Sequence, residues 1–223
     1  PVEIEFAVDL TKDRDGRASF YLLQIKPLIK NIMETEIEIG QLDNDRLLMY
    51  CENGMGNGRI DNIYDVIYVD MDSFDKLKTE KMRDEVAAMN ALMVSQNRSY
   101  VLIGPGRWGT RDRFIGIPVS WSQISKAKII TEVSMEDFPL DASLGSHFFH
   151  NVISMNVGYF SVKHNDLIDY INWDALKKAP EVNRSRYLRH VRFENPLEII
   201  MNGKKRTSMI NFTPTNIASK PGG

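Results

Sequence analysis

A strand–helix–strand unit over residues 62–104 sets the strongest limit on how this chain can fold. Residues 62–70 and 100–104 are short apolar runs, which is typical of buried strands. Between them, residues 76–94 predict a helix with one apolar stripe, made by Met82, Val86, Met89 and Met93. Strands joined by such a helix are most often parallel. The unit therefore predicts a sheet that is at least partly parallel.

Further strand and helix patterns follow on both sides of this unit. We expect strands at 46–54, 127–133, 157–162 and 186–193, helices at 144–156 and 166–178, and a hairpin at 197–212 that turns at Asn202-Gly203. The predicted fold class is α/β (or α+β), in which an N-terminal β-hairpin precedes a mixed, partly parallel sheet with helices.

Composition bounds the class of protein. With 223 residues, 43% of them apolar, the chain can bury a sizeable core, and a net charge of −2 gives no global basic field. Cys51 is the single cysteine, so an internal disulfide is excluded and a reducing compartment is expected. We find no signal-peptide pattern and no apolar run that would span a membrane, so we expect a cytoplasmic protein without a membrane partner.

The first 27 residues predict a hairpin with charged and amide side chains on its strands. The segment "KDRDG" ends in Asp-Gly, a common hairpin turn. A register centred on this turn places Glu5 opposite Gln24 and Glu3 opposite Lys26. Two interpretations remain open: cross-strand pairing on a solvated face, or a cation site in which a carboxylate supplies the oxygen ligand that Mg²⁺ prefers.

Strict alternation makes a further prediction for the second strand of this hairpin. It places Phe20 and Leu22 on the same face as Gln24, with Tyr21 and Leu23 on the opposite face.

The hairpin motif resembles a known family. "E-I-E-F-A" followed by "F-Y-L-L-Q-I-K-P" is similar to the end of the ATP-grasp nucleotide-binding domain of phosphoenolpyruvate synthase and pyruvate phosphate dikinase. The resemblance implies that Glu5 binds the ATP-bound metal and that Gln24 belongs to the nucleotide site. Glu3 and Lys26 match an Asp and an Arg of the family pattern, and Lys26 lacks the bidentate fork of Arg.

The resemblance also implies a domain order and a chemistry. Residues 1–27 would end an ATP-grasp domain, 28–40 would be a linker, 41–214 an α/β domain and 215–223 a flexible tail. The chain would be the C-terminal part of an ATP-dependent phosphotransferase with ATP and Mg²⁺ as cofactors, a small anionic substrate, and upstream domains in the same polypeptide. The isolated fragment would be inactive. The alternative is a non-catalytic, anion-binding regulatory module attached to an ATP-grasp domain.

The loop "GPGRWGTRDRFIGIPV", residues 104–119, is the candidate anion site. Its glycines allow sharp bends where a strand ends, and ligands of open α/β sheets bind at that edge. Arg107 and Arg111 supply permanent positive charge, and Trp108 would offer a flat face for stacking. The alternative is a structural loop whose arginines pair with acids such as Asp112.

His147 is the candidate catalytic residue. The family relays phosphate through a histidine at the start of a helix, and Gly145, Ser146 and His147 echo that motif. The resemblance would make His147 a phospho-carrier, and the alternative is a polar side chain that lines the arginine loop.

Residues 177–206 form a basic stretch. They hold nine Lys or Arg against three Glu, an excess of six positive charges. The excess would permit contact with nucleic acid, but no stacking platform or RNA motif accompanies it. We therefore expect a solvated or interdomain face and no nucleic-acid partner.

Overall fold

The computed structural model describes residues 2–12, 14–27, 43–110, 112, 114–136, 138, 155–163 and 166–213. The chain divides into two compact units, Pro1–Glu34 and Thr35–Gly223. Each unit is described by itself.

The first unit is the antiparallel hairpin of β1 (Val2–Asp9) and β2 (Ser19–Pro27). Gly16 has a φ of 77°, a left-handed conformation that glycine adopts without steric cost. Glu3 is paired with Lys26 and Glu5 with Gln24. This part of the predicted register is confirmed.

A β-bulge changes the rest of the hairpin. Glu5 pairs with Gln24, but Phe6 pairs with Leu22, so Leu23 is an extra residue on β2. Because the bulge shifts the alternation by one residue, Leu22 and Phe20 share a face with Phe6 and not with Gln24. The prediction that they accompany Gln24 is therefore wrong.

The bulge gathers apolar side chains on one face of the hairpin. The stacked rings of Phe6 and Phe20 lie 5.0 Å apart on that face. Its apolar members are each between 44% and 58% exposed: Ile4, Phe6, Val8, Phe20, Leu22 and Ile25. Glu5 and Gln24 belong to the opposite, polar face.

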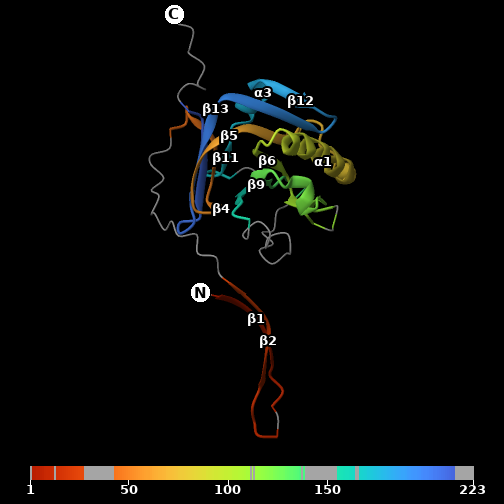
Figure 1. The fold of residues 1–223 in the computed structure, drawn as a ribbon, viewed down its shortest axis with the longest axis vertical. Helices are drawn as coiled ribbons and strands as arrows, with labels where there is room; N and C mark the ends of the chain where they lie inside the picture. Colours follow the sequence, from red (N-terminus) through yellow and green to blue (C-terminus); the bar gives the residue numbers. More distant parts are fainter. Residues whose placement is uncertain are drawn as a thin grey trace, which may run out of the picture. The chain divides into compact units, whose positions relative to one another are not determined.

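The second unit is built on one large mixed sheet (Figure 1). Its strands are β3 (Leu47–Cys51), β4 (Asn53–Met55), β5 (Gly58–Val69), β6 (Tyr100–Pro105), β9 (Ala127–Val133), β10 (Gly158–Val162), β11 (Tyr170–Ile171), β12 (Glu181–Arg184), β13 (Leu188–Asn202) and β14 (Thr207–Asn211). Their order is β11-β3-β14-β13-β5-β6-β9-β10-β4, with β12 paired to β13. The strands β5, β6, β9 and β10 are mutually parallel, and the other pairs are antiparallel.

The expected strand–helix–strand unit is present. Helix α1 (Thr79–Ser95), preceded by the 3-10 turn η1 (Lys76–Lys78), connects the parallel strands β5 and β6. All four predicted stripe residues of α1 are buried. They pack with Ile67, Tyr100 and Leu102 against the outer face of the sheet (Figure 1). The mixed α/β class is thereby confirmed.

Three local predictions need correction. The strand predicted over 46–54 is two strands that break at Glu52. The helix predicted over 166–178 is shorter: α3 spans Trp173–Lys178, because the side chain of Asn172 caps it by accepting the N–H of Ala175 at 2.9 Å. The strand of 186–193 continues to Asn202, and its register shifts around Pro196, which has no N–H to donate.

The sheet closes on itself. β3 and β4 stand far apart in the strand order, yet only Glu52 separates them in the sequence. The Thr131 hydroxyl of β9 lies 3.6 Å from the Met49 sulfur of β3, so side chains from opposite parts of the sheet meet inside. An inner core that includes Leu48, Tyr68 and Phe160 fills the enclosed space.

Candidate functional site

The glycine-rich loop after β6 does not form an anion cradle. It contains β7 (Arg107–Trp108), which pairs with β8 (Gly116–Ile117). Four successive amides donate to acceptors within the chain: Gly106 to Val133 O at 2.9 Å, Arg107 to Ile115 O at 3.0 Å, Trp108 to Glu132 Oε1 at 2.9 Å and Gly109 to Ile117 O at 2.9 Å. These four amides are therefore not available to bind an external anion.

Trp108 is a core residue and not a stacking platform. Its side chain is 2% exposed, and its Nε1 donates to the carbonyl oxygen of Thr131 at 3.0 Å. The indole packs so closely on Gly104 that a Cβ there would lie 2.3 Å from Cζ2 of the ring. The face of the ring is thus closed to a ligand, contrary to the expectation. Arg107 is half-buried, and Arg111 lies outside the described residues.

The carboxylate that this loop holds is Glu132 of β9. Its Oε1 accepts the Trp108 amide, and its Oε2 accepts the Tyr159 hydroxyl of β10 at 2.5 Å. Burial raises the pKa of Glu132 to about 7, although the bonds from Tyr159 and Trp108 and the charge of Arg107 act to lower it. The sequence reasoning missed this residue, whose signal is a lone acid in the apolar strand "AKIITEV".

The same edge of the sheet carries a cavity of about 680 Å³. It lies where β5 and β9 end, at the carboxyl edge of the parallel strands, where ligands of open α/β sheets bind. The cavity is lined by the ends of these strands, the segments that follow them, and α3: Tyr68, Asp70, Met71, Phe74, Asp75, Lys76, Val133, Ser134, Met135, Glu136, Phe138, Trp173 and Lys177. The detectable sequence signal is an acidic and aromatic segment after each strand, "DMDSFD" and "SMEDF".

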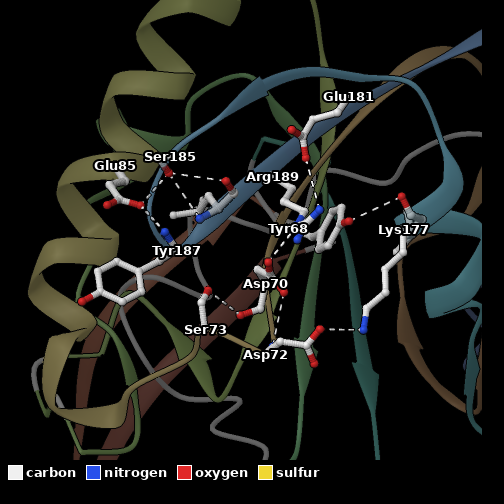
Figure 2. A network of polar contacts seen from close by, with 12 residues as sticks. Tyr68, Asp70, Asp72, Ser73, Glu85, Lys177, Glu181, Ser185, Tyr187 and Arg189 are labelled. Carbon is white, nitrogen blue, oxygen red and sulfur yellow. Dashed lines mark hydrogen bonds and ion pairs between the residues drawn. The ribbon is translucent and has the colours of Figure 1, made fainter.

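Asp70 lines the cavity directly after β5, and contacts from β13 and from the residue before it hold Asp70 in place (Figure 2). The Nε of Arg189 donates to its Oδ2 at 2.7 Å, and this hydrogen bond raises the pKa of the Arg189 guanidinium. The Asp70 amide donates to Tyr187 O at 2.8 Å, and its carbonyl oxygen accepts the Ser73 amide at 3.0 Å. These bonds set the turn that carries Phe74 and Asp75 over the cavity.

A second part of the network holds the neighbouring helices and strands together (Figure 2). Glu85 of α1 accepts the Ser185 hydroxyl at 2.5 Å and the Tyr187 amide at 2.9 Å. The Lys177 ammonium of α3 lies 2.8 Å from Asp72 Oδ2, and this hydrogen bond raises the pKa of Lys177. The rim of the cavity is therefore tied to α1, β13 and α3.

A separate buried cluster surrounds Asp65 in the middle of β5. Its carboxylate accepts from both Nε and Nη2 of Arg98, from Nη1 of Arg192 at 2.5 Å and from Nε2 of His190 at 2.8 Å. Burial acts to raise the pKa of Asp65, but the hydrogen bonds from His190 and Arg98 and the two arginine charges outweigh it, so that the pKa is lowered. No local pattern in the sequence indicates that these four residues meet.

This clustering explains part of the basic stretch. Lys177, Arg189 and Arg192 each pair with an aspartate from the segment 65–72, outside the stretch itself. The local excess of positive charge is thus partly neutralised in the folded unit.

The other predicted site residues fall in the hairpin or outside the described residues. Glu5 and Gln24 are adjacent across the strands and exposed, and Glu3 and Lys26 hold the neighbouring pair of register positions. Among the described residues, no group of three or more His, Cys, Asp or Glu is placed to hold a metal ion. His147 lies outside the described residues, so its role as a phospho-carrier stays a prediction.

Comparison of the chain with protein-family models, with curated proteins and with solved structures finds no match. The family resemblance of the hairpin therefore stays a prediction. In the described part of the chain, no helix combines the length and the apolar character needed to cross a membrane.

Proposed function

We propose that the hairpin contributes the metal-binding edge of a MgATP site in a phosphotransferase that resembles phosphoenolpyruvate synthase and pyruvate phosphate dikinase. The observation that carries the proposal is the pairing of Glu5 with Gln24, next to the pairing of Glu3 with Lys26. An acid and an amide that are adjacent across two strands can contact one ligand together. The Glu5 carboxylate suits Mg²⁺, which takes one or two carboxylates and completes its shell with phosphate and water.

The bulge adds support from the opposite face. A two-stranded ribbon is at best marginally stable alone, and this one exposes a continuous apolar surface. Burial of that surface against an ATP-grasp domain would stabilise the hairpin and leave Glu5 and Gln24 facing the nucleotide. In this proposal Glu5 binds the metal, Gln24 donates to the nucleotide, and Glu3 and Lys26 complete the edge.

The proposal is tested in the full-length polypeptide by steady-state kinetics at varied ATP and Mg²⁺. Glu5→Gln is expected to lower kcat at least tenfold and to raise the Mg²⁺ concentration needed for half-maximal rate, because a metal ligand is lost. Gln24→Ala is expected to raise the KM for ATP with a smaller effect on kcat.

Asp9→Asn is the matched control, because Asp9 lies on the same face of β1 but near the turn, where its carboxylate accepts the Thr11 amide at 2.9 Å. Its kinetics should equal those of the unsubstituted protein. Unchanged Mg²⁺ dependence in Glu5→Gln would contradict the proposal and leave the hairpin pairs as surface contacts.

A further inference from the structure

The cavity at the carboxyl edge of β5 and β9 has the form of a small-molecule site. Its volume, about 680 Å³, lies in the range of roughly 300–1,000 Å³ that drug-sized ligands occupy. It is built by residues from two parallel strands, the segments that follow them and α3, so several independent elements converge on one space. All of its lining residues belong to the second unit.

Two aromatic pairs line this cavity. Phe74 and Phe138 meet edge to face, with ring centroids 5.5 Å apart. Tyr68 and Trp173 form a tilted pair with centroids 6.1 Å apart, and the Tyr68 hydroxyl donates to the Leu176 carbonyl oxygen at 3.4 Å. Phe138 and Tyr68 are almost fully buried, so Phe74 and Trp173 are the more accessible rings of the lining. Aromatic rings favour a flat, polarisable ligand, and their faces attract positive charge.

The polar groups on the lining are mostly acceptors. Three carboxylates, Asp70, Asp75 and Glu136, stand on it with two lysines. Asp70 is already paired with Arg189 and Lys177 with Asp72, which leaves Asp75, Glu136 and Lys76 as the other charged groups of the lining. Carboxylates accept hydrogen bonds from amino groups and repel anions, so the lining complements a ligand with N–H donors and not one with phosphate or carboxylate groups.

We propose that this cavity binds a flat heteroaromatic molecule that carries amino groups. The ring lies against Phe74 and Trp173, the half-buried members of the two pairs. Its amino groups donate to the carboxylates of the rim, with Glu136 at the mouth. The site is distinct from the proposed MgATP edge, because all its residues belong to the second unit.

Saturation-transfer NMR and titration of the intrinsic tryptophan fluorescence, to which Trp173 contributes, test the proposal with four named probes on the full chain. Adenosine and 2-aminobenzimidazole are flat rings with amino groups, benzoate is a flat anion, and cyclohexylamine is an amine without an aromatic ring. For the two ring amines, we expect saturation transfer from the protein to the ring protons. We also expect them to bind at least tenfold more tightly than benzoate and cyclohexylamine.

Two variants assign the binding to the cavity. Phe74→Leu keeps an apolar side chain but removes one ring, and Glu136→Gln removes one exposed carboxylate. Each variant is expected to lower the affinity for the ring amines by roughly fivefold or more, with the circular dichroism spectrum unchanged. Phe114→Leu is the control, because Phe114 is an exposed aromatic residue that is not among the residues lining the cavity.

Three results would overturn the proposal: no transfer to either ring amine, binding that both variants leave unchanged, or benzoate that binds as tightly as the ring amines. The last result would make the cavity an anion site.

Discussion

The Tyr159 hydroxyl donates to Oε2 of Glu132 at 2.5 Å, and this bond joins the side chains of two adjacent parallel strands, β9 and β10. The other oxygen of the same carboxylate accepts the Trp108 amide. One buried acid therefore connects both strands to the loop that follows β6.

This acid should make the stability of the second unit depend on pH. Burial raises the pKa of Glu132 to about 7, above the ordinary value of 4.5, so the folded state holds a proton that the unfolded state releases. The stabilisation is present below pH 4.5 and is lost as pH rises through 7, by on the order of 2–3 kcal/mol. The free energy of unfolding, measured by urea titration from pH 4.5 to 8, should show this fall.

Glu132→Gln supplies the control for that experiment. The amide cannot ionise but can still accept from Trp108, so the difference in stability between Glu132→Gln and the unsubstituted protein should shift in favour of the variant as pH rises. A difference that stays constant from pH 5 to 8 would show that Glu132 does not titrate in this window.

Breaking the Asp65 cluster should destabilise the second unit far more than breaking the exposed pair of Asp72 and Lys177. Asp65→Asn leaves Arg98, Arg192 and His190 around an uncharged group, and removal of one partner from a buried ion pair costs about 3–5 kcal/mol. Asp72→Asn removes only the exposed contact with Lys177 and should change stability by less than about 1 kcal/mol. Chemical denaturation of both variants checks the ranking, which equal effects would contradict.

The thiol of Cys51 should be unreactive in the folded protein. Its side chain is fully buried on β3, and burial raises its pKa to about 12, so almost no thiolate forms at pH 8. A chromogenic disulfide reagent should label it only after denaturant is added. Lys12→Cys, placed in the exposed hairpin turn, is the positive control. Rapid labelling of Cys51 without denaturant would mean that β3 opens readily.

Gly104 and Trp108 should show strong energetic coupling. A Cβ at Gly104 would lie 2.3 Å from Cζ2 of the Trp108 ring, so Gly104→Ala should cost roughly 1–3 kcal/mol by overpacking. Phenylalanine has no atom equivalent to Cζ2, so the same change should cost much less when Trp108→Phe is also present. A double-mutant cycle measures the coupling, and additive effects would exclude this contact as the cause.

Local patterns in the sequence predicted the elements that depend on neighbouring residues. The parallel pairing around α1 followed from helical spacing between two apolar runs, and the outer pairs of the hairpin followed from the Asp-Gly turn. The bulge at Leu23 was not predictable from alternation, because one extra residue leaves the composition of each strand unchanged and only its phase differs.

The predictions that failed were those whose outcome depends on distant residues. Glycine and arginine density in the loop 104–119 indicated an anion site, but the Trp108 amide is bonded to the carboxylate of Glu132, 24 positions away. The cavity was missed for the same reason, because its two aromatic pairs come from segments that meet only when β5 and β9 end at one edge. Alternation and spacing do not report such meetings.

Closure of the sheet has a consequence for how copies of this unit behave toward one another. An open sheet ends in strands whose unpaired N–H and C=O groups are templates for another chain. Here β4 pairs with β10, while β3, which precedes β4 by one residue, pairs with β14. Strands of the closed sheet are therefore paired on both sides along much of their length. Among the described strands of this sheet, those with one unpaired side are short ones such as β11 and β12. The unit thus offers little backbone for edge-to-edge polymerisation, even though its strands are rich in buried apolar residues.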